Sequence, residues 1–302
     1  MKKTIPTILL SALLFLTGAA AEPASTNSFT RDEDVIYGRK FGVALTMDVF
    51  HPVKTNNGVG IIFVVSGGWF SAHEAINQAF INPYIKRGYT VFAVVHGSQP
   101  KFKIPEIMND MNRAVRFIRF NAKKFGVDAN RLGVTGGSAG GHLSLILGTQ
   151  GANGSSGASD PVERESSAVQ CVACFFPPTD FLNYGKPGEI ALGENVLKAF
   201  SPAFGESPTN AIAKIEFGKR ISPIYSITSN LPPTLIIHGD VDKLVPIQQA
   251  QTFVEAAKNV GATAELITKP GKGHGWKDTA DDFESCADWF DAHLRELKSG
   301  KK

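Results

Sequence analysis

The chain has 302 residues, of which 43% are hydrophobic and 20% charged, so it is long and apolar enough to bury a sizeable core. The formal net charge is only +3, and Lys2 and Lys3 contribute two of those charges at the extreme N-terminus. Because no basic cluster follows, the charge pattern excludes a nucleic-acid-binding surface. We therefore expect small or neutral substrates.

The N-terminal residues have the pattern of a cleavable signal peptide. Met1-Lys2-Lys3 is positively charged, Ile8 to Leu16 is apolar, and Ala19-Ala20-Ala21 offers a small-residue cleavage site. The apolar stretch is too short to span a bilayer, and no later segment reaches transmembrane length. We predict cleavage after Ala21 and a secreted or periplasmic mature protein.

After a loose linker, apolar strand patterns alternate with amphipathic helix patterns. Strands are expected at 35–37, 44–50, 60–65, 90–95, 132–135, 168–176, 234–238 and 264–268, and helices at 76–87, 105–125, 246–260 and 281–297. This alternation predicts an α/β fold, with a mostly parallel central sheet and helices on both faces. In such sheets, sites gather at the carboxyl ends of the strands.

The rhythm of strands and helices breaks between about residues 179 and 230, where the periodicity is weak and aromatic residues are scattered. We interpret this segment as a lid or cap inserted over the site, within one domain that spans residues 22–302. Irregular helices packed on the surface are the alternative.

Two polar segments are expected to carry no chemistry. One side of the long helix is basic, which is more typical of a solvated face than of an anion site; its residues are Arg113, Arg116, Arg119, Lys123 and Lys124. The segment from Gly151 to Ser159 is rich in glycine and serine and predicts a flexible loop.

The Cys171-x-x-Cys174 spacing suggests a metal or redox site, but both residues lie in a strand by composition. Residues three apart on a strand point to opposite faces and sit about 10 Å apart, beyond the disulfide limit of about 7 Å. We therefore predict buried structural thiols.

A glycine-rich turn stands between an apolar run and helix-forming residues at 136–140. Gly136-x-Ser138-x-Gly140 fits the nucleophile elbow, in which a serine occupies a cramped strand-to-helix turn. The glycines let backbone pass close to the strained serine, and the following helix directs its free N–H groups at negative charge that develops there. A turn without chemistry remains the alternative unless a base and an acid accompany it.

Later loops supply both partners, in the order Ser, Asp, His that an α/β-hydrolase requires. Of the seven histidines, only His274 lies in a glycine-rich loop after the last strand. Asp240 and Asp242 both follow the strand at 234–238, and spacing does not choose between them. A calcium site of the EF-hand type is excluded because Val245 and Gln251 occupy the positions that need glycine and glutamate. We predict neither a metal nor a cofactor.

Three motifs together resemble the α/β-hydrolase esterases, from about Val35 to the C-terminus. The motifs are Gly136-Gly137-Ser138-Ala139-Gly140-Gly141-His142, the segment from His238 to Pro246, and Gly273-His274-Gly275-Trp276. More narrowly, they resemble the carboxylesterase, feruloyl or acetylxylan esterase and dienelactone-hydrolase-like group, which overlaps the prolyl-oligopeptidase catalytic domain family. That family uses the aspartate of D-x-x-V-P, which implies Asp242 as the acid, with Asp240 as the fallback.

The family's oxyanion motif, H-G-G-G-W, is similar to Val65-Ser66-Gly67-Gly68-Trp69, where valine and serine replace the first two residues. The resemblance implies that a backbone N–H from Gly67, Gly68 or Trp69 stabilises the oxyanion together with that of Ala139. We expect Trp69 and Trp276 either to form walls of the substrate pocket or to be core aromatics.

The sequence thus predicts an exported serine carboxylic-ester hydrolase with an acyl-enzyme intermediate. Its expected substrates are small-molecule or carbohydrate-linked esters; its oligomeric state stays open. A prolyl-oligopeptidase-type serine peptidase is the first alternative, although no N-terminal propeller fits before the catalytic domain. A non-catalytic binding protein on a hydrolase scaffold is the second.

Overall fold

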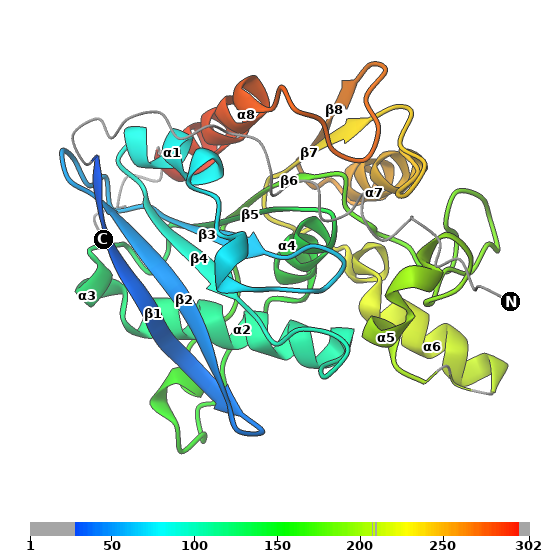
Figure 1. Ribbon diagram of the computed structural model, residues 1–302, viewed down its shortest axis with the longest axis horizontal. Coiled ribbons are helices and arrows are strands. Elements are labelled where there is room, and N and C mark those ends of the chain that lie inside the picture. The colour runs from blue at the N-terminus through cyan, green and yellow to red at the C-terminus, as the bar shows by residue number, and fades with distance from the viewer. Residues whose placement is uncertain (1–27, 207, 209, 296–302) are drawn as a thin grey trace, which may run out of the picture.

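The computed structural model describes residues 28–206, 208 and 210–295 (Figure 1). The predicted signal peptide and its cleavage site lie outside these residues. Within them, no helix combines the length and the apolarity that crossing a membrane requires.

One eight-stranded sheet forms the centre of the molecule, with strand order β1-β2-β4-β3-β5-β6-β7-β8. The strands are β1 (Phe29–Lys40), β2 (Val43–Pro52), β3 (Gly60–Val65), β4 (Thr90–Val95), β5 (Leu132–Gly137), β6 (Cys171–Phe175), β7 (Thr234–Gly239) and β8 (Ala264–Lys269). β2 pairs antiparallel with β1 and β4, and the remaining pairings are parallel. The predicted α/β architecture is confirmed.

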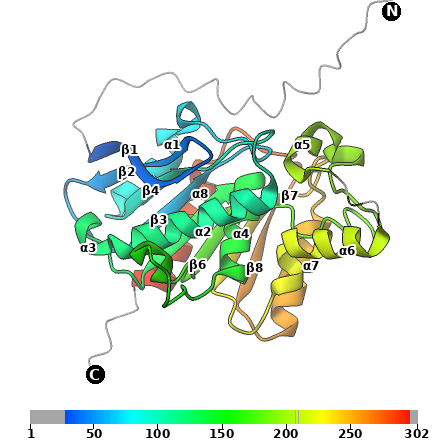
Figure 2. The ribbon, with the colours of Figure 1, turned by 90° about the horizontal axis from the view of Figure 1, so that it is seen from below.

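Helices cover both faces of the sheet (Figure 2). They are α1 (Gln78–Lys86), α2 (Ile104–Phe120), α3 (Ala122–Phe125), α4 (Ala139–Gln150), α5 (Ser201–Phe204), α6 (Ala211–Ile221), α7 (Gln248–Asn259) and α8 (Ala280–Phe290). α2, α4 and α7 contribute to the core on one face, whereas α1 and α8 contribute to the core on the other.

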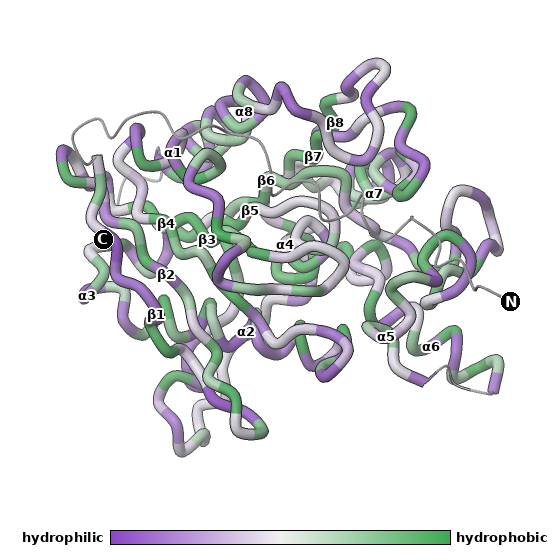
Figure 3. Tube along the Cα trace, in the orientation of Figure 1, coloured by the Kyte–Doolittle hydropathy of each residue, from purple (hydrophilic) through white to green (hydrophobic). Residues whose placement is uncertain are grey.

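The central strands are buried on both sides because their side chains enter both cores. In β3, Ile62 and Val64 join one core, and Ile61 and Phe63 join the other. This explains why the sequence of β3 is a continuous apolar run rather than an alternating one. Figure 3 shows these hydrophobic strands in the middle of the fold.

Some element boundaries differ from the sequence prediction. The expected helix at 105–125 is interrupted at Asn121, between α2 and α3. The N-terminal hairpin is longer than predicted, because β1 keeps pairing with β2 through two register shifts.

Both cysteines of β6 are buried, and they belong to opposite cores, as predicted. Burial raises the pKa of both thiols, so they remain protonated.

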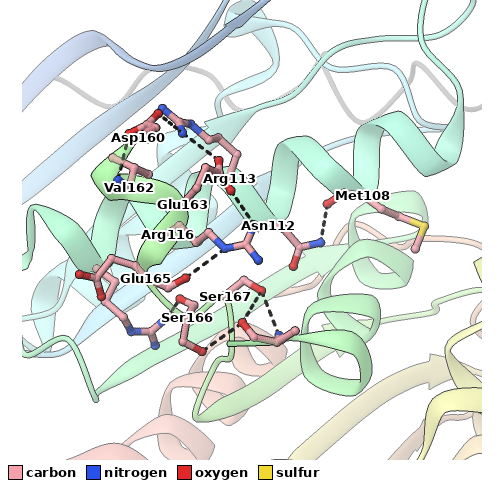
Figure 4. A network of polar contacts seen from close by, with 12 residues as sticks. Met108, Asn112, Arg113, Arg116, Asp160, Val162, Glu163, Glu165, Ser166 and Ser167 are labelled. Carbon is pink, nitrogen blue, oxygen red and sulfur yellow. Dashed lines mark hydrogen bonds and ion pairs between the residues drawn. The ribbon is translucent and has the colours of Figure 1, made fainter. Parts of the chain in front are cut away.

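The basic side of the long helix is not a solvated face, and that prediction was wrong for its three arginines. Arg113 contacts Asp160 and Glu163, at 2.5 and 2.8 Å, and Arg116 contacts Glu163 at 3.0 Å (Figure 4). Arg119 donates to the backbone carbonyls of Ala129, Ser166 and Ala168.

The glycine- and serine-rich loop is hydrogen-bonded to the segment that contains Glu163 and Ser167. The N–H of Ser155 donates to the carbonyl of Glu163, and the N–H of Ser167 donates to that of Ala152, both at 2.9 Å. The charge pattern of the long helix does not reveal the ion pairs of its arginines, because their acidic partners lie about 50 residues further along the chain.

Between β6 and β7, the predicted cap segment contains α5, α6 and short 3-10 helices at Asn195–Phe200 and Pro223–Ser226. In Figures 1 and 2, α5 and α6 lie at the side of the molecule opposite β1 and β2. Phe200 of this segment packs against Trp69, with ring centroids 6.3 Å apart.

Candidate active site

Three loops at the carboxyl ends of β5, β7 and β8 bring a serine, an aspartate and a histidine together. Nε2 of His274 lies 2.9 Å from Oγ of Ser138, and Nδ1 of His274 lies 2.8 Å from Oδ2 of Asp242. This is the geometry of a nucleophile, a base and an orienting acid.

Ser138 stands on a strained turn between β5 and α4. Its φ of 55° and ψ of −119° lie in a region that side-chain-bearing residues rarely adopt. The neighbouring glycines allow the turn to close, since a Cβ at Gly136 would stand 2.7 Å from the carbonyl of Gly140. A Cβ at Gly140 would stand 2.8 Å from the carbonyl oxygen of Val64. The hydroxyl is thereby held at the tip of the turn, next to the N-terminus of α4.

The two candidate aspartates are in different environments. Asp242 is buried, and its Oδ1 accepts hydrogen bonds from the N–H groups of Leu244 and Val245 at 2.9 Å. Asp240 is exposed, and its Oδ1 accepts a hydrogen bond from the N–H of Gly271. Asp242 is the aspartate that contacts His274, whereas Asp240 binds the backbone of the loop that contains Gly271.

Burial alone would raise the pKa of Asp242, but hydrogen bonds from His238, His274 and the backbone hold that pKa well below its usual range. The carboxylate thus stays ionised, as an acid that stabilises an imidazolium must. His238, at the end of β7, is fully buried behind it. Its Nε2 donates to the carbonyl of Val245 at 2.8 Å and lies 3.5 Å from Oδ2 of Asp242.

A tight turn at residues 67–70 lies beside the serine. The N–H of Gly67 donates to the carbonyl of Phe70, and the N–H of Phe70 donates to that of Gly67, both at 2.9 Å. Gly68 and Trp69 have φ values of 56° and 60°, which glycine tolerates far better than tryptophan. Because its N–H is already engaged, Gly67 is not an available oxyanion donor, contrary to one of our alternatives.

The carbonyl groups of this turn are also hydrogen-bonded. The side chain of Gln99 donates to the carbonyl of Gly68 at 3.4 Å, and its backbone N–H donates to that of Trp69 at 3.1 Å. The N–H groups of Gly68 and Trp69 make no hydrogen bond to the part of the chain that the structure describes. Ala139 is the first residue of α4, so its N–H has no acceptor within the helix.

Neither tryptophan lines the cavity, so the expectation that they form its walls is corrected. Trp69 is 2% exposed and donates from Nε1 to Nδ1 of His142 at 3.2 Å. Trp276 is 8% exposed and donates from Nε1 to the carboxylate of Asp282 at 2.6 Å. Each indole fills the core behind the pocket, and its polar atom has a partner there.

A cavity of about 210 Å³ opens at Ser138 and His274. Seven phenylalanines line it: Phe63, Phe70, Phe80, Phe175, Phe176, Phe200 and Phe283. Consecutive rings lead away from His274, since the ring of Phe176 lies 4.7 Å from that of His274, and the ring of Phe283 lies 4.8 Å from those of both Phe175 and Phe80. Most of the cavity wall is therefore apolar, and Ser138 and His274 contribute polar groups to it.

One cluster of potential metal ligands, Asp34, Asp48 and His73, occurs within the described residues. The guanidinium of Arg31 already contacts Asp48, and its Nη2 lies 3.3 Å from Nε2 of His73. A cation of the protein itself thus already contacts two of these three groups.

Comparisons with known proteins find esterases that are similar to this chain. The chain is 29% identical over 219 residues to esterase LipC of Mycobacterium tuberculosis (strain ATCC 25618 / H37Rv), which covers 72% of the chain and 52% of the relative. It is 26% identical over 248 residues to isoprenylcysteine alpha-carbonyl methylesterase ICME of Arabidopsis thaliana, covering 76% and 53%. The chain spans about half the length of these curated relatives.

Solved esterase structures share the fold. A truncated carbohydrate esterase from gut microbiota superimposes with a TM-score of 0.75 at 24% identity, covering 91% of the chain and 100% of that structure. An acetyl ester-xyloside bifunctional hydrolase from Caldicellulosiruptor lactoaceticus does so with a TM-score of 0.65 at 27% identity, covering 82% and 85%. The fold is therefore the α/β-hydrolase fold that the sequence predicted. Because the BD-FAE family model matches residues 47–257, the chain belongs to the BD-FAE family.

Proposed function

We propose that this protein is a carboxylic-ester hydrolase in which Ser138 is the nucleophile, His274 the base and Asp242 the orienting acid. The observation that carries the proposal is the continuous hydrogen-bonded chain from Oγ of Ser138 through His274 to Asp242. The esterase names of its relatives and structural neighbours support the same reaction class.

The contacts support a two-step acyl transfer. Nε2 of His274 takes the proton of Ser138 as Oγ attacks the ester carbonyl, and the charge on the imidazolium is balanced by Asp242. The same nitrogen then protonates the leaving alcohol. Water, deprotonated by His274, attacks the acyl-enzyme and releases the acid and the free serine.

Backbone N–H groups would stabilise the oxyanion that forms in both steps. Gly68 lines the cavity and has an N–H without an acceptor among the described residues, and Ala139 follows the nucleophile at the start of α4. We assign the oxyanion donors to these two residues. Loss of one such donor typically lowers kcat by about 100- to 1000-fold.

The cavity supports small acyl groups, since its volume of about 210 Å³ is modest and its wall is mostly apolar. We propose short-chain or carbohydrate-linked esters as substrates, and a secreted or periplasmic location from the sequence of residues 1–21. We also propose that the segment at about 179–230 acts as a cap, because its Phe200 lines the cavity.

Kinetics on paired substrates tests the reaction class. We expect hydrolysis of p-nitrophenyl acetate and butyrate to exceed hydrolysis of proline-containing p-nitroanilides, and Ser138→Ala to abolish the esterase activity. Faster hydrolysis of the amides would favour a peptidase. Equal ester hydrolysis by the Ser138→Ala variant would contradict the proposal.

A further inference from the structure

A second serine–histidine pair lies beside the catalytic one. Ser66 directly follows β3 and lines the cavity, and its Oγ lies 2.8 Å from Nε2 of His96. The oxyanion motif that this segment resembles has glycine at this position, so the hydroxyl is an added polar group in the cavity wall.

The environment of His96 fixes which of its nitrogens carries the proton. Nδ1 lies 2.9 Å from the carbonyl oxygen of Gly97, which can only accept, so Nδ1 is protonated. The ring is 3% exposed, and burial lowers the pKa of His96 to about 4, with a smaller contribution from Lys40. At neutral pH the imidazole is uncharged, and its Nε2 is an acceptor.

The hydroxyl of Ser66 therefore donates its one proton to His96. A hydroxyl has two lone pairs besides that proton, so Ser66 can offer only acceptor capacity to a molecule in the cavity. Its Oγ has no other hydrogen-bond partner within the described residues. His96 itself is held in place, since its backbone N–H donates to Oγ of Ser71 at 3.2 Å.

Ser66 lies near the segments that carry the proposed nucleophile and a proposed oxyanion donor. It precedes Gly68 by two residues, and its Cβ is 3.7 Å from the position of a Cβ on Gly140, which is two residues after the nucleophile. Phe63 and Val65 of the same strand continue the cavity wall away from the serine, toward Phe80. Ser66, Phe63 and Val65 thus belong to one continuous wall of the cavity.

We propose that Ser66 is a specificity-determining residue that accepts a hydrogen bond from a hydroxyl on carbon 2 of the acyl group. The site would then favour esters of 2-hydroxy acids over otherwise similar esters that lack a donor there. This inference rests on the proposed esterase function, and it names the acyl class for that same site.

The test compares kcat/KM for the phenyl esters of 2-hydroxypropanoic and 2-methoxypropanoic acid, at neutral pH. The methoxy ester has a comparable inductive effect but no hydrogen to donate. We expect the hydroxy-to-methoxy ratio to fall about 10-fold in Ser66→Ala, as for a neutral hydrogen bond, and to be retained in Ser66→Thr. Thr279→Val removes another hydroxyl from the same cavity and should leave the ratio unchanged.

Several results would overturn the inference. An unchanged ratio in Ser66→Ala, while hydrolysis still depends on Ser138, would do so. A ratio that falls only in Thr279→Val would also overturn it. A Ser66-dependent preference that is confined to 2-hydroxyethyl over 2-methoxyethyl esters would place the contact on the alcohol side and would likewise overturn it. If Ser66→Ala fails to fold, Ser66→Cys, a weaker acceptor of similar size, must lower the ratio. Absence of hydrolysis of both esters by the wild type would instead contradict the proposed function.

Discussion

Nε1 of Trp69 lies 3.2 Å from Nδ1 of His142, so the turn at 67–70 is hydrogen-bonded to α4, the helix that follows Ser138. Nε2 of the same imidazole donates to the carbonyl of Ile221 at 2.7 Å, at the end of α6. A buried, uncharged histidine thus joins the turn that carries a proposed oxyanion donor, the helix α4 and the proposed cap.

Replacing Trp69 by phenylalanine tests this connection, because it keeps most of the ring volume but removes the N–H. Nδ1 of His142 would lose its donor, which we expect to cost about 1–3 kcal/mol in the free energy of unfolding. Because the turn also loses a tether, we expect kcat to fall about 10-fold with little change in KM, measured on p-nitrophenyl butyrate.

Trp289→Phe is the matched control, since it removes an indole N–H bonded to the carbonyl of Pro233, outside the site. It should lower stability without lowering kcat. Equal losses of kcat in both variants would show that Trp69 has no particular role in positioning the turn.

The two aspartates after β7 are expected to differ sharply in function. Asp242→Asn should lower kcat by about 10,000-fold, because the amide no longer orients and stabilises the protonated form of His274. Asp240→Asn should change kcat by no more than about 3-fold, since a neutral acceptor can still bind the N–H of Gly271. Steady-state kinetics with circular dichroism as a folding control decides the point, and a larger loss in Asp240→Asn would reverse the assignment.

Sequence reasoning could predict the strand–helix alternation, the elbow and both loops, because each depends on local patterns. It left Asp240 and Asp242 unresolved from spacing alone, since only three-dimensional contacts show which carboxylate faces His274. It did not reveal the roles of His238, His142 and His96. Each of these histidines is hydrogen-bonded to a backbone carbonyl group, and no sequence motif records such a contact.

Acid should destabilise the fold through two buried histidines. Burial lowers the pKa of His96 and His142 to about 4, whereas each has a pKa of about 6.5 when unfolded. Between these values the unfolded chain binds protons that the folded chain does not, so the free energy of unfolding falls as the pH falls. Each residue contributes about 1.4 kcal/mol per pH unit in that window.

Urea unfolding of the wild type and of His142→Gln between pH 4 and 7 measures this effect. The variant should be less stable at pH 7 but should lose stability more slowly on acidification, because one titrating group is gone. Identical pH slopes in the two proteins would show that His142 does not remain uncharged in the fold.

Arg119 should contribute more to stability than the exposed lysines of its segment, because it is partly buried and bonded to three backbone carbonyls. Arg119→Met should lower the free energy of unfolding by about 2–3 kcal/mol, since the carbonyls lose a charged donor. Lys123→Met, at an exposed position, should change it by less than about 0.5 kcal/mol. Thermal unfolding checks both, and similar values would restore the view of a solvated basic face.

The most direct test of the proposed nucleophile is covalent trapping. After incubation with diethyl p-nitrophenyl phosphate, intact-mass analysis should show one diethylphosphoryl group per chain, and peptide mapping should place it on Ser138. Trapping should be absent in Ser138→Ala and much slower in His274→Ala, because the hydroxyl then lacks its base. An adduct on another residue, or equal labelling of the Ser138→Ala variant, would contradict the account.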